Sequence, residues 1–598
     1  MESKICLVEE LKKLKESSKE AVENLNSFSP FKEYIHVKRK VQDELFHLLQ
    51  KTNESNKSQL ILVCGGVGDG KSHLISYFMK YNSDLMNNFE KHNDATESFE
   101  PQKTSIDTLN DVLDAFSDEN IENSNEKFIL AINLGALNNF IDSEYKDRFK
   151  KLRKYVIEKG ILESSITDNS FDESSNFQFI NFSDYHMYSL KEDGPRSEYI
   201  EDIINKITND HKENIFYKSY KNYCLSCENK YKCPVKLNYE MLMKDNIKST
   251  VSTLLIEAIV KHKMIVSTRS LLNFVYDFIV NNNLDNMNTK ELQKEISSLE
   301  LIDTIKYMFT SNLFEHSELS NILSSVSTLD SVHIRNEELD SLIIKLNITD
   351  DMSVIFREYL QLDEGHYLEN TIGNKEALEE AFVKSKLKRD SDILKENLIK
   401  MFIRLYLFIP NNDEINLKDN IYNQYMKDLY NWNKGLAKKL KRVYDDVKSS
   451  IYKWNGESIE GNINIFIGKN QMRYKVSQTL NIDADISNLN KCDEEELHKF
   501  NSNLILRFKN EEKNKSHEID IDFNLYSLLM AIKNGYRPNK TDKYNYINFV
   551  EFINKMTKLG TQSKEVIIED RSGNTSSKYK LVYDKNFESY KFESINGV

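Results

Sequence analysis

Eight consecutive residues near the start of the chain have the types and spacing that bind nucleotide phosphates. Gly65-Gly66-Val67-Gly68-Asp69-Gly70-Lys71-Ser72 fits the phosphate-loop pattern G-x-x-x-x-G-K-[ST], and His73 follows directly. Glycine leaves room for backbone N–H groups to converge on an anion. The Lys71 ammonium can reach the β- and γ-phosphates, and the Ser72 hydroxyl can ligate Mg²⁺. These nine residues therefore predict a site for ATP and Mg²⁺.

The flanking residues predict the elements that must position this loop. The apolar run 60–64 precedes it and is typical of a buried strand. Apolar residues follow it at helical spacing: Leu74, Ile75, Phe78 and Met79. A helix that begins near Lys71 would point the positive end of its dipole at the anion. The order is thus strand, glycine-rich loop, helix.

Two further apolar runs, 127–134 and 177–182, alternate with helical patterns such as 104–116. This alternation predicts a parallel sheet with crossover helices. The expected fold is an α/β P-loop NTPase core of AAA-like layout. A long helical region and a small C-terminal α+β domain should follow it.

Ligands of parallel sheets bind at the carboxyl ends of strands, so polar residues there are the catalytic candidates. ATPases usually place an acid at one strand end, but Asn133 stands there in this chain. We therefore expect either that Glu97 or Asp94 activates water or that turnover is slow. Asn181 or Ser183 would sense the γ-phosphate. The alternative is that each asparagine only caps the turn that follows.

Three other features complete the candidate nucleotide site. Arg269 stands at a predicted helix start, with Thr268 or Ser267 as cap, where a lid arginine could reach the γ-phosphate. The alternative is an ordinary solvated or ion-paired arginine. Arg335 is a second arginine candidate. The segment 31–39 could pack on the nucleotide base or be a plain loop.

Half of the six cysteines fall within ten residues. Cys224, Cys227 and Cys233 form C-x2-C-x5-C-P, a spacing at which thiolates can share one Zn²⁺. A closed site needs a fourth ligand, either His211 or a residue brought in by folding. Reduced thiols in a loop are the alternative.

Composition limits the class of protein. The 598 residues are too many for one hydrophobic core, so several domains are expected. No run of about 18 apolar residues exists, so no membrane-spanning helix is expected. The small number of cysteines favours a reducing cytoplasm. A net charge of −13 gives no support to nucleic-acid binding by the whole surface. The aromatic and basic segment 421–454 is a local candidate for DNA contact, or a solvated face over an aromatic core.

We expect four regions. Residues 1–50 form an N-terminal helical segment, and 51–245 form the P-loop NTPase core with the cysteine knuckle at 224–233. Residues 246–455 form a helical lid and helical domain, and 456–598 form the C-terminal α+β domain. Neither of the last two carries a recognisable catalytic constellation.

Several segments in order resemble one family. They are VCGGVGDGKSHLISYF, NDATESF, AINLGALNNF, INFSDYHMYSL, CLSC with CPVKLNYE, and STRSLLNFVYDFIV. Over residues 28–290 the chain resembles the DptF family, the ATPase components of DNA phosphorothioation-dependent restriction. The resemblance implies a bacterial defence protein that works with DptG and DptH against DNA lacking the sulfur modification. It leaves open direct DNA contact and homo-oligomerisation, and Asn133 departs from the usual acidic strand end.

Two functions of different kind follow. The first is an ATPase, converting ATP and water to ADP and phosphate within a DNA-restriction complex. The second is an ATP-dependent conformational switch or scaffold with little intrinsic hydrolysis, favoured by Asn133 and the overall acidity. A small-molecule kinase is disfavoured, because the long helical region and terminal domain exceed what a kinase needs.

Overall fold

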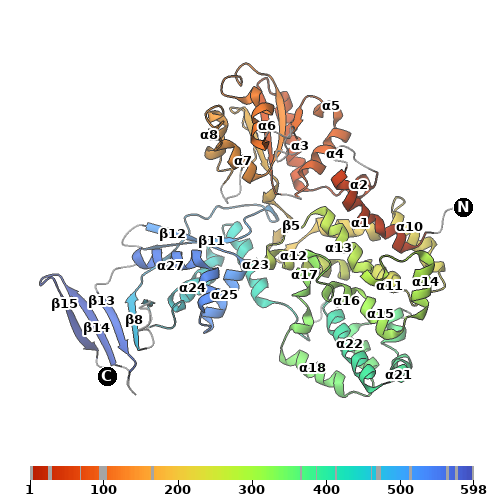
Figure 1. Cartoon of the computed structure of the whole chain (residues 1–598). Coiled ribbons are helices and arrows are strands. Elements are labelled where there is room, and N and C mark those ends of the chain that lie inside the picture. Colours follow the sequence, from red (N-terminus) through yellow and green to blue (C-terminus); the bar gives the residue numbers. More distant parts are fainter. Residues whose placement is uncertain are drawn as a thin grey trace. The chain divides into compact units, whose positions relative to one another are not determined.

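The structure is a computed structural model of the chain. It describes residues 5–23, 30–66, 69–92, 104–162, 168–363, 366–385, 387–410, 414–458, 461–465, 473–510, 515–559, 565–572 and 577–595. The chain divides into two compact units, Met1–Ser189 with Pro195–Lys418, and Leu190–Gly194 with Asp419–Val598 (Figure 1). Among the described helices, none is long and apolar enough to cross a membrane.

A four-stranded parallel sheet lies in the first unit, as the alternation of strands and helices predicts. Its strands are β1 (Gln59–Cys64), β2 (Glu90–His92), β3 (Lys127–Ile132) and β4 (Phe177–Asn181), in the order β2-β3-β1-β4. In this register Cys64 pairs with both Ile132 and Asn181. The carboxyl ends of β3 and β4 therefore flank the end of β1, where the phosphate loop begins.

Helices cover both faces of this sheet. Leu60, Leu62 and Cys64 face a core shared with α6 (Ser105–Val112), α7 (Leu134–Ile141) and α8 (Lys150–Glu158). Ile61 and Val63 face the core on the other side, with α3 (Lys40–Glu54) and α4 (Lys71–Tyr81). Burial on both faces explains why β1 is apolar throughout rather than alternating. Each such side chain contributes about 1.5–3 kcal/mol on burial, which fixes the root of the loop.

The rest of the first unit is mainly helical. Its other helices are α1 (Leu7–Glu23), α2 (Pro30–Ile35), α5 (Ser83–Met86), α9 (Glu198–Thr208), α10 (Ile215–Asn222), α11 (Pro234–Leu242), α12 (Asp245–His262), α13 (Thr268–Ile279), α14 (Thr289–Ser298), α15 (Leu301–Tyr307), α16 (Phe309–Phe314), α17 (Asn321–Ser327), α18 (Glu337–Ile348), α19 (Met352–Leu360), α20 (Tyr367–Thr371), α21 (Lys375–Lys384) and α22 (Lys388–Tyr406). A hairpin of β5 (Tyr185–Lys191) and β6 (Gly194–Arg196) follows β4, and its tip groups with the second unit.

The segment 1–50 does not act as one element. Helix α1 packs on α10 and α13, and Lys15 on α1 forms ion pairs with Asp277 (3.1 Å) and Asp285 (3.2 Å). Helix α3 instead packs on the sheet through Val41, Leu45 and other buried residues. Helix α1 thus belongs with the helical region, and helix α3 belongs with the parallel sheet.

Antiparallel sheets characterise the second unit, in keeping with the expected α+β domain. Five strands follow the order β15-β14-β13-β8-β7, and three the order β12-β11-β9. The elements are α23 (Asn420–Asn433), α24 (Ala437–Lys453), β7 (Asn462–Ile465), β8 (Tyr474–Thr479), β9 (Asp483–Asp485), β10 (Leu497–Lys499), β11 (Leu504–Asn510), β12 (Lys515–Ile521), α25 (Phe523–Lys533), α26 (Lys540–Asn545), α27 (Ile547–Leu559), β13 (Glu565–Asp570), β14 (Ser577–Asp584) and β15 (Ser589–Ile595). Helices α23 and α24, which the sequence places with the helical domain, pack on α25 in this unit.

Three basic residues of α24, Lys439, Arg442 and Lys448, have acidic partners. Arg442 forms ion pairs with Asp428 and with Asp446 (2.8 Å), and Lys439 pairs with Glu192 at 2.7 Å. A cation already paired with a carboxylate offers less to a DNA phosphate. Contact between DNA and this segment stays a prediction.

Candidate nucleotide site

The phosphate loop turns directly into α4. Gly70 lies in the left-handed region at φ +90°, a conformation that favours glycine, and α4 begins at Lys71. The Lys71 Nζ donates to the carbonyl oxygens of Gly65 (2.9 Å) and Gly66 (2.6 Å). Val67 and Gly68 lie outside the described residues. The ammonium is therefore held over its own loop, bonded to neutral oxygens that a polyphosphate could replace.

Asp69 folds its side chain back into the loop. The Gly66 N–H donates to Asp69 Oδ2 at 2.6 Å and to Ser183 Oγ at 3.1 Å. The Ser183 hydroxyl also donates to Asp69 Oδ2 at 2.9 Å. A Cβ on Gly65 would come within 2.8 Å of Asp69 Oδ2 and 2.9 Å of Phe182 Cβ, so this position admits only glycine without rearrangement. The loop is thus tied to the turn after β4.

The two strand-end asparagines lie on either side of β1, as expected, but both act as caps. Asn133 Oδ1 accepts from the Ala136 N–H at 2.7 Å and caps α7. Asn181 is buried; its Oδ1 accepts from the Ser183 N–H (3.2 Å) and its Nδ2 donates to Asp184 Oδ1 (2.7 Å). Asn181 therefore acts on the loop by positioning Ser183, the alternative sensor, which makes the direct contact.

The two candidates for the catalytic carboxylate, Glu97 and Asp94, lie in the segment 93–103, which is outside the described residues. Strand β2 ends at His92, level with Leu130 of β3. The strand that precedes this segment is separated from β1 by β3. The role of Glu97 and Asp94 as water activators stays a prediction.

Arg39 joins the loop to the hairpin after β4. Its Nη1 donates to the Asp69 carbonyl oxygen at 2.9 Å and its Nη2 to that of Tyr185 at 2.8 Å. The guanidinium lies 5.7 Å from the ring centre of Tyr199 on α9. The Tyr199 hydroxyl in turn lies 2.5 Å from Thr268 Oγ1, in the first turn of α13. A continuous set of contacts thus leads from the loop to α13.

Arg269 is the next residue of that first turn. The helix start is as expected: Ser267 caps α13, with a capping box completed by Ser270. The Arg269 Nε and Nη2 atoms are buried, and within the described residues they have no hydrogen-bond partner. Buried polar atoms are nearly always bonded, and leaving a donor unbonded costs about 1–3 kcal/mol. These two donors are therefore the unexplained polar atoms at the start of α13.

Two imidazoles form a contact beside the loop. His36 Nδ1 lies 3.0 Å from His73 Nε2, and His36 Nε2 lies 3.0 Å from Gln42 Oε1. The His36 ring stacks on Tyr77 with ring centres 4.3 Å apart. Loss of hydration lowers the pKa of His36, and it lowers the pKa of His73 to about 4, with a further contribution from the charge of His36. Both rings are therefore neutral at pH 7.

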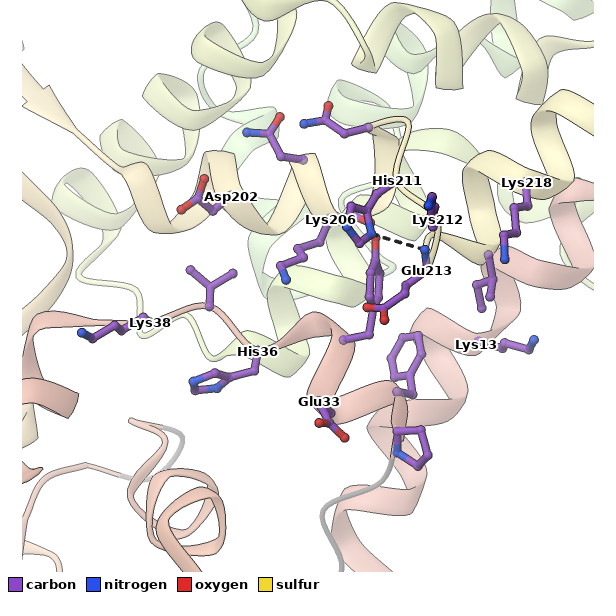
Figure 2. A pocket seen from close by; sticks show the side chains of 17 residues that line it. Lys13, Glu33, His36, Lys38, Asp202, Lys206, His211, Lys212, Glu213 and Lys218 are labelled. Atoms are coloured by element: carbon purple, nitrogen blue, oxygen red, sulfur yellow. Dashed lines mark hydrogen bonds between the residues drawn. The ribbon is translucent and has the colours of Figure 1, made fainter. Parts of the chain in front are cut away.

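A groove opens on the other side of His36 (Figure 2). It has a volume of about 1220 Å³ and runs between the extended residues after α2 and helix α9. His36 and Lys38 line one wall, and Asp202 and Lys206 line the other. Because His36 also contacts His73, the groove and the phosphate loop are neighbours. The segment 31–39 thus borders both, as one of its two sequence interpretations requires.

His211 does not complete the cysteine knuckle. Its ring lies beside Tyr34 in the groove, with centres 6.5 Å apart, and its Nδ1 accepts from the Glu213 N–H at 3.3 Å. The cysteines of the chain are free thiols. Arg335, the second arginine candidate, is exposed and lies 3.7 Å from Asp340. Within the part of the chain that the structure describes, neither His211 nor Arg335 forms a hydrogen bond or ion pair with the phosphate loop.

No family model, curated protein or solved structure matches the chain. The site must therefore be interpreted from its own residues. Sequence patterns located the loop, the strand-end asparagines and Arg269, but they gave no role to Asp69 as an internal acceptor or to Arg39 as a clamp. No spacing rule marks a contact between residues so far apart along the chain.

The imidazole contact predicts a pH dependence. The pKa of a histidine in the unfolded chain is about 6.5. The native pKa values of His36 and His73 are both lower. The unfolded chain therefore binds protons first as pH falls. Native stability should therefore decrease between pH about 6.5 and about 4. We expect the double change His36→Gln and His73→Gln to make that decrease shallower in melting temperatures measured against pH. His47→Gln, at an exposed position on α3, is the control; equal slopes in all three proteins would contradict the assignment.

Proposed function

We propose that this protein binds ATP with Mg²⁺ and hydrolyses it. The observation that carries this proposal is the phosphate-loop pattern between a buried parallel strand and α4, with Lys71 over the loop. Lys71 would exchange its two carbonyl partners for phosphate oxygens, and Ser72 would ligate Mg²⁺. Bound Mg²⁺ would supply charge compensation between the phosphates.

The proposal assigns the remaining groups by position. Arg269 would donate its unsatisfied buried N–H groups to the γ-phosphate, neutralising charge as it develops. Ser183, held by Asn181, would report the loop's occupancy to the hairpin after β4. Glu97 or Asp94 would orient the attacking water, because Asn133 cannot accept a proton as a carboxylate does.

The groove is the proposed place for the nucleoside. It adjoins the loop at His36, and its volume exceeds what a base and ribose require. Polar and apolar groups both line it, among them Val37 and Asn205. This combination suits a planar base with a hydroxylated sugar better than it suits a purely anionic ligand.

The biological setting rests on the family resemblance. We propose that the chain is the ATPase of a bacterial DNA-restriction complex, acting in the cytoplasm with DptG and DptH on DNA that lacks phosphorothioation. The chain would contact DNA directly or through these partners. The ion-paired Lys439 and Arg442 of α24 favour contact through the partners.

A second function, an ATP-dependent switch with little hydrolysis, is favoured by one observation. Asn133 and Asn181 stand at the strand ends that flank the loop, and both are engaged in capping. Such a protein would bind ATP tightly and change conformation without turnover. The two functions differ in the rate of phosphate release and not in the binding site.

Replacing Lys71, the lysine of the phosphate loop, should lower ATP hydrolysis. We expect Lys71→Ala to lower ATP hydrolysis by about 10²-fold or more, because it removes the cation that meets the transferring phosphoryl group. Lys80→Ala is the matched control on the same helix, since Lys80 pairs with Glu33 at 2.6 Å, away from the loop. Steady-state phosphate release with unmodified DNA and the partner proteins is the measurement. Undiminished turnover in the Lys71 variant would refute the site.

Arg269 should matter for hydrolysis more than for binding. We expect Arg269→Ala to reduce turnover by about 10²–10³-fold while changing the Kd for ATP only a few-fold, because the γ-phosphate charge grows in the transition state. Arg335→Ala, at an exposed arginine, is the control. Single-turnover hydrolysis with titrated ATP binding measures both quantities. Equal effects of the two substitutions would exclude the assigned role.

Filling the groove should weaken nucleoside binding selectively. We expect Val37→Trp to raise the Kd for ATP at least about tenfold, the cost of about 1.4 kcal/mol of lost contact, and to leave tripolyphosphate affinity unchanged. Val354→Trp, at an exposed site on α19, controls for the added indole. Calorimetric titration with ATP and with tripolyphosphate measures the two affinities. A parallel loss of both affinities would place the defect in the loop instead.

A further inference from the structure

Strand β15 (Ser589–Ile595) forms an open edge of the five-stranded antiparallel sheet of the second unit (Figure 1). It pairs with β14 along all seven of its residues, and no other strand among the described residues pairs with it. Every residue of β15 is exposed, whereas β7 at the opposite edge of the sheet is largely buried and packs on α24. An exposed edge presents unpaired N–H and C=O groups, which can extend the sheet by pairing with a further strand.

One face of β15 carries two aromatic side chains that stay exposed. Side chains alternate along a strand, so Tyr590 and Phe592 share this face with Tyr579 and Tyr583 of β14. The ring centres of Phe592 and Tyr579 lie 4.9 Å apart, and those of Tyr590 and Tyr583 lie 5.1 Å apart. Tyr590 is nevertheless 70% exposed, and Phe592 is 60% exposed. Covering these two rings would contribute hydrophobic free energy to pairing at this edge.

The other face of β15 carries two opposite charges, Lys591 and Glu593. Lys591 forms an ion pair with Asp584 of β14 at 2.6 Å, whereas Glu593 has no ion-pair partner within the residues that the structure describes. A lysine alone on an edge strand discourages pairing with another chain. A carboxylate two residues further along changes this, because the strand then carries both members of an ion pair.

The order of these charges is complementary to itself. When two copies of β15 run antiparallel with Phe592 opposite Phe592, Lys591 of each copy lies opposite Glu593 of the other. A pairing centred on Lys591 would instead set lysine opposite lysine, and one centred on Glu593 would set glutamate opposite glutamate. Opposite charges directly across two strands stabilise the pairing and like charges destabilise it. The charges therefore favour the pairing centred on Phe592, which also brings two exposed phenylalanine rings together.

We infer that two copies of this protein associate by antiparallel pairing of β15 about Phe592, which joins their five-stranded sheets into one continuous sheet. Each copy contributes the same strand, so the interface is isologous and the assembly closes at two copies. A seven-residue edge is small beside a standard protein interface, which buries about 1,600 Å². We therefore expect reversible association with micromolar rather than nanomolar affinity.

This association does not rest on the proposed nucleotide chemistry. The described residues of the candidate nucleotide site belong to the first unit, whereas β15 belongs to the second. The molecular mass in solution reports the association, and phosphate release reports ATP turnover. A failure of one proposal is therefore distinguishable from a failure of the other.

Sedimentation equilibrium of the full-length protein, from about 1 µM to about 100 µM, measures the association. We expect the wild-type chain to shift from monomer toward dimer across this range. Lys591→Glu alone and Glu593→Lys alone should each raise the Kd of the dimer at least about tenfold, because each sets like charges opposite one another twice in every dimer. Lys578→Glu, at an exposed position of β14, changes the net charge as Lys591→Glu does and should leave the Kd unchanged.

Mixing the two charge variants tests the pairing itself. Lys591→Glu gives one copy two negative charges and Glu593→Lys gives the other two positive charges, so an equimolar mixture should form a mixed dimer with about the wild-type Kd. A mixture that stays monomeric while the wild-type chain dimerises would overturn the pairing centred on Phe592. A wild-type dimer that neither single substitution weakens would place the interface elsewhere. A wild-type chain that stays monomeric throughout the range would overturn the inference and leave the edge to a strand of another protein.

Discussion

The candidate nucleotide site depends on how one guanidinium distributes its hydrogen bonds. Arg39 donates to two main-chain carbonyl oxygens, that of Asp69 in the loop and that of Tyr185 at the start of the hairpin. Carbonyl oxygens cannot move away as side chains do, so this clamp sets the separation of the loop from the hairpin after β4. The ring of Tyr199 lies near the same guanidinium and connects it to Thr268. One cation thus couples the sheet, the hairpin and α13.

The sheet makes such coupling possible because it leaves the loop no freedom at its root. Strand β1 is buried on both faces and hydrogen-bonded on both edges, to β3 and β4. Shifting β1 along its neighbours would break the hydrogen bonds at both edges and disturb the packing of both cores. Motion is therefore confined to the residues after Cys64. A rigid root with an adjustable tip is what a phosphate-binding loop requires.

The sequence predicted those parts of the fold that local pattern determines. Apolar runs located β1, β3 and β4, and capping residues located the start of α13 at Ser267. Strand β2 was missed, because a three-residue strand reading Glu-Lys-His has no apolar signal. The sequence also did not predict that α1 packs on the helical region while α3 packs on the sheet. An amphipathic pattern shows that a helix buries one face, but it does not identify the surface that covers this face. The spacing of residues likewise gave no sign that His211 would lie beside Tyr34.

The self-satisfied loop has a consequence for what can occupy it. Its lysine and its Gly66 N–H are both bonded internally, to carbonyl oxygens and to the Asp69 carboxylate. An isolated small anion such as sulfate would have to break these bonds and approach a like charge, with few contacts in return. A metal-bound polyphosphate brings its own cation and many oxygens. A metal-bound polyphosphate would therefore gain more from entering this loop than free phosphate or sulfate would.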